Sequence, residues 1–492
     1  MKKILFISII LGIISADNTC IISNDNRDIY RQNYIEPEQI QSEHFIIHFT
    51  VADDDFQDIN GELYNLESNY GYAQSIIDWA EYSLNIYLES GWEPLPPDCD
   101  ESVSDLNSPN HCINFGGNAL YDIYISNDGP GMVVPENSYP IAPYYGGRTS
   151  YMKISTLSNS YESLPSWSHH VVAHEVHHSI QLRYGVGTSG SPGNYIHNLW
   201  FFEQTASYME NVVFPNSYHL YTMLANCDVV TPLTHTNHGL DYPAELYPYR
   251  SALWQKYLVE SIGDSSIIRY MWEDYGLRFA SGEAVSLLPI YENSINIATD
   301  NQHTMTESFN EYALWRYFTG DRSIQNIFFD ESAGYCTSST FDLEGTYSLW
   351  SNKGGTYFIN IPQGGADFII SSENSDALNC KHLTINSNNE FSLSDISLNT
   401  NISIDSSSNE NQVLILSTNY NNIESNEISF TINLNNSNLL GDLNYDGEID
   451  VVDAIIIINI ILNEQFDSLA DLNEDNAINI IDIVLLVDII IN

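Results

Sequence analysis

Two segments near the end of the chain repeat one another and constrain the fold more tightly than any other part of the sequence. GDLNYDGEIDVVDAIIIINIIL begins at Gly441 and ADLNEDNAINIIDIVLLVDIII begins at Ala470, so matching positions lie 29 residues apart. In each copy a polar stretch rich in aspartate and asparagine precedes an apolar stretch. The repeat predicts two similar units, each a polar loop followed by an apolar helix.

The acidic and amide side chains of both loops have the spacing of a calcium-binding loop. Such loops supply oxygen ligands at positions 1, 3, 5, 7, 9 and 12, with a sharp turn at position 6. Gly447 occupies the turn position in the first loop and Asn476 in the second, where asparagine tolerates a left-handed backbone. The candidate ligands are Asp442, Asn444, Asp446, Glu448, Asp450 and Asp453 in the first loop, and Asp471, Asn473, Asp475, Ala477, Asn479 and Asp482 in the second.

Paired loops with trailing helices resemble a type I dockerin, a small α-helical domain with paired EF-hand-type calcium loops, and the resemblance covers residues 439–492. It implies Ca²⁺ as a cofactor and a cohesin-like domain as a partner. The pairs after the loops, Val451 with Val452 and Ile480 with Ile481, are more apolar than familiar recognition pairs. The alternative is a calcium-stabilised cap without a partner.

The stretch SWSHHVVAHEVHHSIQLRYG, residues 166–185, contains an HExxH motif. On a helix, His174 and His178 share one face and can bind one zinc ion. Glu175 lies beside them, which suits a base acting on metal-bound water. The opposite face carries residues that are expected to pack inward: Val172, Val176 and Ile180.

A catalytic zinc site needs a third protein ligand and one open position. A third histidine at metzincin spacing is absent, since Tyr184 stands there. His169, His170 and His177 are expected to support the ligands or face solvent. His170 shares the four-residue spacing with His174, so a site with three histidines is one alternative.

The stretch NLWFFEQTASYMENVVFP supplies an acidic candidate, Glu203, 25 residues after His178. It resembles the third-ligand helix of gluzincin metallopeptidases of the aminopeptidase-N type. The matching residues are Trp200, Glu203, Ala206, Ser207, Tyr208 and Glu210. The resemblance implies a zincin-like α+β domain with Glu203 as third zinc ligand. Glu210 is the rival ligand, although it is expected instead to support the ligands or to face solvent.

Upstream, YGGRTSYMKIST at residues 145–156 resembles the strand that borders the cleft and pairs with substrate in such enzymes. It lacks the Gly-x-Met-Glu-Asn segment with which aminopeptidases hold a free amino terminus. The resemblance therefore implies an endopeptidase.

The implied reaction is hydrolysis of a peptide bond. Zinc lowers the pKa of its water, and Glu175 takes the proton and passes it to the leaving amine. A further donor for the oxyanion is expected downstream of the third ligand, as in the family. Tyr249 is favoured, and the alternatives are Tyr247, His235 and His238.

Residues 1–16, MKKILFISIILGIISA, have the layout of a secretory signal peptide, which predicts a secreted or surface-tethered protein. No later apolar run is long and charge-free enough to span a bilayer.

Residues 17–335 are assigned to the metallopeptidase domain. EHFIIHFTV and YDIYISN alternate like strands, and AQSIIDWAEYSLNIYLES has helical spacing. Further helical patterns lie at 217–226, 245–261, 264–274 and 303–318.

Residues 336–438 contain short alternating runs separated by Asn, Ser and Gly clusters. The runs are TYFINI, ADFIIS, HLTIN, QVLILS and ISFTINL. They predict an all-β sandwich, interpreted as a spacer domain.

Six cysteines in an exported chain fit up to three disulfides, and Cys99 with Cys112 closes the shortest loop.

The formal net charge is −50, from 65 acidic and 15 basic side chains. Nucleic acids and anionic membranes would repel such a surface, so neither is expected as a partner.

These features predict a secreted, multidomain zinc endopeptidase that acts on a protein or peptide substrate and carries a calcium-binding, dockerin-like tether. Two other classes remain open. One is a dockerin-borne protein that degrades or binds polysaccharide, although no carboxylate pair can be assigned to glycosidase geometry. The other is an inactive, protease-like adhesin, against which the intact Glu175 argues.

Overall fold

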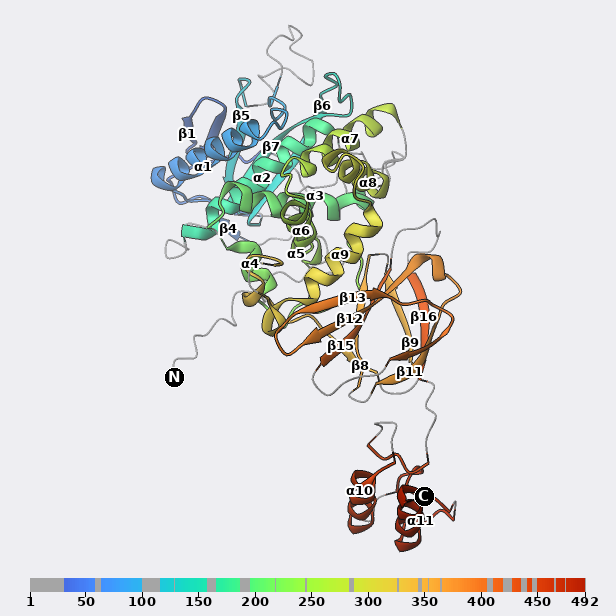
Figure 1. The fold of residues 1–492 in the computed structure, drawn as a ribbon. Helices are drawn as coiled ribbons and strands as arrows, with labels where there is room; N and C mark the ends of the chain where they lie inside the picture. Colours follow the sequence, from blue (N-terminus) through green and yellow to red (C-terminus); the bar gives the residue numbers. More distant parts are fainter. Residues whose placement is uncertain are drawn as a thin grey trace. The chain divides into compact units, whose positions relative to one another are not determined.

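The computed structural model divides the chain into two compact units (Figure 1). The first comprises Met1–His235 and Leu240–Thr337, and the second comprises Thr236–Gly239 and Ser338–Asn492. The residues that the structure describes are 31–57, 63–99, 116–127, 129–156, 165–185, 195–216, 218–243, 246–282, 287–324, 327–343, 347–352, 354–362, 365–404, 410–418, 427–434, 440–444, 449–463, 466–473 and 475–491. The predicted signal peptide, residues 1–16, lies outside them.

A five-stranded mixed sheet forms in the first unit, with the strand order β1-β2-β5-β7-β6. In that order the strands are β1 (Glu38–Gln41), β2 (Phe45–Phe49), β5 (Tyr121–Ser126), β7 (Arg148–Ser155) and β6 (Gly131–Ser138). The three central strands run parallel, and the two outer strands pair antiparallel with their neighbours. The strands predicted from EHFIIHFTV and YDIYISN are confirmed as β2 and β5.

The edge of this sheet differs from the sequence prediction. Residues 145–156 were expected to border the cleft, but β7 pairs with β5 on one side and β6 on the other. An interior strand has its backbone groups engaged by both neighbours, so it cannot pair with a substrate. The strand at this edge is β6, which the sequence analysis did not identify, and β1 forms the opposite edge. A short pair, β3 (Asp55–Gln57) with β4 (Leu63–Asn65), forms separately.

Two long helices, α1 (Tyr70–Glu89) and α2 (Pro165–Tyr184), contact each other and the sheet. Figure 1 shows them side by side over the strands. Helix α1 begins where the Asn69 side chain accepts a hydrogen bond from the Tyr72 amide, and it confirms the predicted helix. The Tyr87 hydroxyl donates to the Ala173 carbonyl at 2.9 Å, which fixes α1 against α2.

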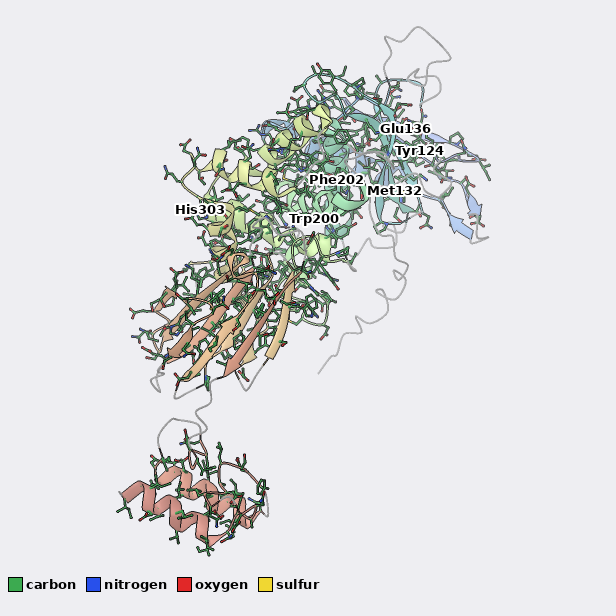
Figure 2. All side chains as sticks on the ribbon, turned by 90° about the vertical axis from the view of Figure 1, so that its right-hand side faces the viewer. Tyr124, Met132, Glu136, Trp200, Phe202 and His303 are labelled. Atoms are coloured by element: carbon green, nitrogen blue, oxygen red, sulfur yellow. A yellow bond between two sulfur atoms is a disulfide. The ribbon has the colours of Figure 1, made fainter. Side chains whose placement is uncertain are left out.

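Helix α3 (Tyr195–Val213) lies along α2 and begins the helical half of the unit. The Phe201 and Phe202 rings both pack on Trp272 at 4.7 Å, and Figure 2 shows Phe202 within this part of the molecule. The remaining helices are α4 (His219–Leu224), α5 (Tyr247–Arg250), α6 (Leu253–Ile262), α7 (Ile267–Ser281), α8 (Leu287–Ala298) and α9 (Met305–Tyr317). The four predicted helical patterns are confirmed, with 245–261 divided between α5 and α6, whereas α8 was not predicted.

The segment for which the sequence predicts a β-sandwich forms two sheets in the second unit. One has the order β13-β12-β15-β10-β8 and the other β14-β11-β16-β9. The strands are β8 (Phe341–Asp342), β9 (Tyr347–Asn352), β10 (Thr356–Asn360), β11 (Ala366–Ser371), β12 (Leu378–Asn386), β13 (Phe391–Asp395), β14 (Asn401–Ile404), β15 (Glu410–Thr418) and β16 (Glu427–Leu434). One hydrophobic core joins inward residues of both sheets, including Leu414 from one and Phe368 from the other. The five predicted strands correspond to β10, β11, β12, β15 and β16.

The C-terminal repeat forms two helices, α10 (Val451–Leu462) and α11 (Ile480–Ile491), which share a small core. Ile457 and Leu486 are fully buried in it, one from each helix. Because each helix follows one polar loop, the repeat in the sequence is a repeat in the structure. The chain is thus a multidomain α+β protein with a helical C-terminal region.

Cys227 and Cys336 form a disulfide across a sequence separation of 109 residues. Cys99 is also disulfide-bonded, and its expected partner Cys112 lies outside the described residues. Cys380 is a free thiol in the β-sheet core.

Among the described residues, no helix combines the length and the apolar character needed to cross a membrane.

Candidate metal centre

Two helices of the first unit face each other with matching polar stripes. His170, His174 and His178 recur every four residues on α2, and Glu203 and Glu210 lie seven apart on α3. Both spacings place side chains on one helix face. Glu203 contacts His174 and His178, whereas Glu210 contacts His174, so the two helices run in opposite directions.

Three of these residues converge on one point. His174, His178 and Glu203 each offer one ligand atom, and these atoms lie within 4.8 Å of one another. The Glu203 Oε2 atom is 3.1 Å from His174 Nε2 and 3.2 Å from His178 Nε2. All three side chains are at least 96 % buried, with exposed fractions of 4 %, 0 % and 0 %. The structure therefore brings together the three residues for which the sequence predicts zinc ligation.

Hydrogen bonds on the far side of each ring determine which nitrogen faces this point. His178 Nδ1 lies 2.7 Å from Gln181 Oε1, and the Gln181 amide nitrogen donates to Phe202 O and Thr205 Oγ1. That orientation leaves Oε1 as an acceptor, so Nδ1 of His178 carries the proton. His174 Nδ1 likewise donates to the Glu210 carboxylate at 2.7 Å. In their neutral forms, both imidazoles present a lone pair on Nε2 to the Glu203 oxygen.

The charges of the cluster follow from its burial. Burial lowers the pKa of His178, which favours the neutral imidazole. Burial alone would raise the pKa of Glu203, but the adjacent His178 and hydrogen bonding with His174 lower it to about 2. Two neutral imidazoles and one carboxylate around a single point repel one another unless a proton or a cation lies between them.

Glu175 lies against the first residue of the edge strand β6. A Cβ atom placed on Gly131 would be 2.7 Å from Glu175 Oε1 and 2.8 Å from Val171 Cγ1. Only glycine therefore allows the strand to approach α2 this closely. Glu175 is buried, with 1 % of its surface exposed, and follows His174 directly on α2.

Of the four candidate oxyanion donors, Tyr249 contacts a residue of the cluster. Its ring stacks on His174 with centroids 5.6 Å apart and an angle of 17°. Tyr247 is buried and packs on Tyr242. His235 is exposed beside Thr234, and His238 belongs to the second unit, where it packs near Trp350.

The other histidines of α2 have different surroundings. His177 is fully buried, with edge contacts to Tyr87 at 5.3 Å and Trp92 at 4.8 Å, and burial lowers its pKa well below the usual value. His169 packs against Phe214 at 4.5 Å. Val172, Val176 and Ile180 are fully buried, as the helical pattern predicts.

A second cluster of potential ligands lies one turn along α2. His170, Glu210 and His219 offer ligand atoms within 4.8 Å of one another. His219, from α4, was not recognised in the sequence, because it is nine residues from Glu210 and belongs to no motif. His170 groups with these two residues and not with His174 and His178. The alternative of one site with three histidines is therefore wrong.

The two C-terminal loops are closed by their last aspartates. Asp453 accepts hydrogen bonds from the Leu443 and Asn444 amides at 2.7 and 3.1 Å, and Asp482 accepts one from the Leu472 amide at 3.0 Å. In the second loop Asn476 has φ 65°, the left-handed conformation expected at its turn position. Asp446 and Glu448 lie outside the described residues. The other predicted ligands lie in the described parts of the two loops, and the loop closure draws both ends of each loop together.

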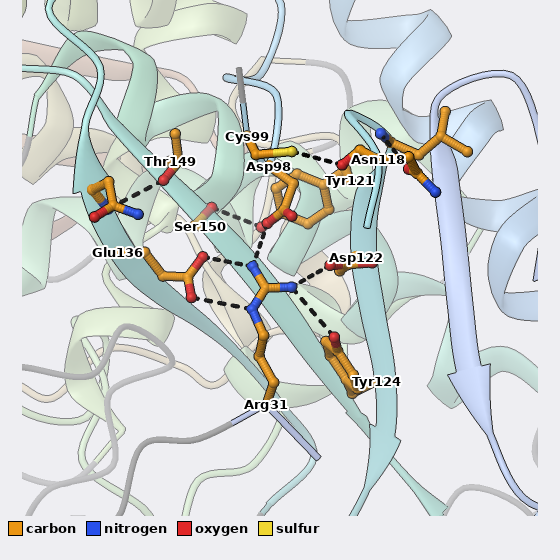
Figure 3. Close-up of polar contacts among 12 residues, drawn as sticks. Arg31, Asp98, Cys99, Asn118, Tyr121, Asp122, Tyr124, Glu136, Thr149 and Ser150 are labelled. Carbon is orange, nitrogen blue, oxygen red and sulfur yellow. Dashed lines mark hydrogen bonds and ion pairs between the residues drawn. The ribbon is translucent and has the colours of Figure 1, made fainter. Parts of the chain in front are cut away.

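A buried charge cluster ties the beginning of the described chain to the sheet (Figure 3). The Arg31 guanidinium contacts three carboxylates, Asp98 at 2.5 Å, Glu136 at 2.7 Å and Asp122. The guanidinium carbon of Arg31, Cζ, also lies 4.9 Å from the centroid of the Tyr151 ring. The cluster was not predicted, because its members are scattered over more than 100 positions without a local pattern.

Comparison with protein families identifies the C-terminal region. The family model for the dockerin type I domain matches residues 440–490, which include both loops and both apolar helices. A type I dockerin binds Ca²⁺ and implies a cohesin domain as partner. Proteins with dockerins are extracellular and tethered to a cellulosome or cell surface, and this chain is accordingly an extracellular protein. The comparison with curated proteins gave no match.

Proposed function

We propose that the first unit is a zincin-like metalloendopeptidase, tethered outside the cell by the dockerin domain. The observation that carries the proposal is the convergence of two Nε2 lone pairs and one carboxylate oxygen in a buried site. Two histidines and one glutamate form a donor set that zinc accepts, with the fourth position left for water.

The contacts behind the ligands support the same interpretation. Histidine ligands of zinc donate their other ring proton to a carboxylate or carbonyl, which holds the ring in place. Glu210 has this role for His174, and Gln181 has it for His178. A cluster with only a structural role would not need the Nε2 atoms of both His174 and His178 to face the same oxygen of Glu203.

The sheet edge offers a place for an extended substrate. β6 is one of the two outer strands, and its first residue, Gly131, contacts Glu175. A peptide can add to a sheet edge through backbone hydrogen bonds. A chain laid along β6 would thus pass the carboxylate of Glu175, and it would need no free terminus, in keeping with an endopeptidase.

Each residue has a distinct task in the proposed reaction. Zinc, when bound, supplies the Lewis acid for hydrolysis. Glu175 takes a proton from the attacking water and gives it to the leaving amine. Tyr249, partly exposed and stacked on His174, donates a hydrogen bond to the oxyanion that develops on the substrate carbonyl.

Metal analysis combined with casein digestion tests the proposal on the full chain. Glu175→Gln should keep its zinc and lose casein digestion by at least 100-fold, since general base catalysis contributes about 10²–10⁴. Tyr249→Phe should lower kcat by roughly 10²-fold with KM little changed. His177→Leu is the matched control on the same helix and should keep both zinc and activity.

Two outcomes would overturn the proposal. One is purified wild-type protein that binds no zinc after incubation with it. The other is unchanged digestion by Glu175→Gln.

The dockerin match favours one rival, a polysaccharide-degrading or glycan-binding protein, because a tether to a cellulosome brings a protein to polysaccharide. The same preparations, incubated with soluble xylan and cellulose, decide between the two. Sugar release or binding that survives in Glu175→Gln, with casein left intact by the wild type, would support the rival.

For the tether itself we propose a cohesin-binding face on the two helices. Val451 and Ile480, the first residues of α10 and α11, are 65 % and 67 % exposed. Exposed apolar side chains at matching positions favour a partner surface over a solvent-facing cap. Loss of binding to type I cohesin domains in Val451→Asp/Ile480→Asp would support this face, and unchanged binding would exclude it.

A further inference from the structure

The second histidine cluster lies beside the candidate zinc site and is built from the same kinds of groups. His170 is one helical turn before His174 on α2, and Glu210 is two turns after Glu203 on α3. His219 is supplied by α4. The rows of polar residues on α2 and α3 thus contain more potential metal ligands than one ion would use.

The donor atoms are close enough to share an ion. The ligand atoms of His170, Glu210 and His219 lie within 4.8 Å of one another. His219 Nδ1 is 2.6 Å from Glu210 Oε2, and the His170 and His219 rings stack with centroids 4.0 Å apart. Zinc bonds nitrogen and oxygen at about 2.0–2.2 Å, so the three atoms need to move little to surround one ion.

Glu210 is positioned to serve both clusters at once. Its Oε1 accepts the His174 Nδ1 proton, while its Oε2 contacts His219. Each oxygen therefore has a separate task, and binding at the second cluster need not disturb the support of His174.

Charge and access are both suitable for a cation. Glu210 is 2 % exposed, so its negative charge is buried and requires a compensating positive charge. A divalent ion in the candidate zinc site would lie beside the carboxylate of Glu203, so Glu210 is not needed to balance it. His219 is 19 % exposed, which gives an ion in solution a route to the otherwise buried cluster.

We propose that His170, Glu210 and His219 form a second site for a divalent transition-metal ion, joined to the first through the Glu210 carboxylate. A proton on His219 is the competing source of positive charge. The ion would hold α4 against α2 and α3 and would fix the carboxylate that orients His174.

Metal stoichiometry tests the second site independently of catalysis. Full-length protein is stripped of metal, kept in millimolar Ca²⁺ to fill the C-terminal loops, and titrated with Zn²⁺ or Co²⁺ against a chromophoric chelator. We expect two tight equivalents for the wild type, one for His219→Ala, one for His178→Ala and none for the double variant. His169→Ala, a neighbouring imidazole outside both clusters, should keep two.

The result also separates this inference from the proposed peptidase. One wild-type equivalent that His178→Ala abolishes and His219→Ala leaves intact would overturn the second site alone. Loss of one equivalent in His219→Ala with none lost in His178→Ala would support the second site and remove the zinc site of the proposed function. Thermal melts of each metal-free variant verify that a lost equivalent reflects a lost ligand and not a lost fold.

Glu210→Gln gives a further test, because this residue belongs to the second cluster and also accepts the Nδ1 proton of His174 in the first. It should remove the second equivalent and weaken the first by about 10–100-fold, the usual effect of losing the partner of a histidine ligand. Unchanged stoichiometry and affinity in Glu210→Gln would contradict the shared carboxylate.

Discussion

At the scale of single residues, the histidine-rich helix shows how identical side chains acquire different roles. His174 and His178 direct Nε2 toward Glu203 because Glu210 and Gln181 hold their Nδ1 atoms. His177, between aromatic rings, is a neutral part of the core. The hydrogen-bond partner of Nδ1, and not only the place of the histidine in a motif, thus determines whether Nε2 can bind a metal ion.

The contact between Gln181 and His178 leads to a prediction about metal affinity. In Gln181→Met the Nδ1 proton of His178 loses its acceptor, so the ring can rotate or change its tautomer. We expect zinc affinity to fall by about 10–100-fold. Competition titration with a zinc chelator measures the change, and His177→Leu should bind zinc like the wild type. Equal affinity in Gln181→Met would show that the amide does not orient the ligand.

At the scale of helices and strands, the sequence was most informative where a local pattern carries the information. The α1 periodicity and the alternating strands β2 and β5 were readable because each element has one face in the core. The α8 helix was missed because Pro289 interrupts its pattern, although proline is tolerated in a first turn.

Pairing between elements could not be predicted in the same way. The position of β6 at the sheet edge depends on which strands meet, and no local period encodes that choice. The HExxH spacing and the family resemblance selected His174, His178 and Glu203 as candidates, whereas His219 comes from a different helix and joins the second cluster only through the fold. Local spacing and the resemblance together therefore identified the first cluster, and neither identified the second.

The Arg31 cluster, which joins the chain before β1 to β5 and β6, predicts how stability depends on pH. One guanidinium carries a single positive charge and faces three carboxylates, so it cannot balance all of them. Burial, followed by repulsion from Asp122 and Glu136, outweighs Arg31 and raises the pKa of Asp98 to about 9. The folded protein therefore keeps a proton that the unfolded chain releases near the ordinary aspartate pKa of 3.8.

Because the folded-state pKa is the higher one, the Asp98 contribution to stability falls as pH rises from about 4 to 9, by at most about 1.4 kcal/mol per pH unit. Asp98→Asn cannot ionise and should lose this slope. Urea unfolding of the first unit, followed by tryptophan fluorescence at pH 5, 6.5 and 8, measures it. The exposed Asp228→Asn is the control and should retain the wild-type slope. Parallel slopes for wild type and Asp98→Asn would contradict the assignment.

At the scale of the whole molecule, the acidic composition has a specific use at the C-terminal end. The chain carries a formal charge of −50, and the two loops concentrate carboxylates within a small domain. Asp453 and Asp482 are fully buried there. Without cations these groups repel one another, while the core shared by α10 and α11 is small. The dockerin domain should therefore depend on Ca²⁺ for folding far more than the first unit does.

Selective return of metal ions tests this dependence. The full chain is stripped of metal and then given Ca²⁺ alone or Zn²⁺ alone, and limited proteolysis with mass spectrometry follows residues 440–490 and the α2–α3 pair separately. Ca²⁺ should protect residues 440–490, because it neutralises the loop carboxylates, and Zn²⁺ should not replace it. The α2–α3 pair should resist cleavage throughout, since its helices pack on the sheet and on Trp272 irrespective of Ca²⁺. Equal protection of residues 440–490 with and without Ca²⁺ would show that the apolar helices alone suffice.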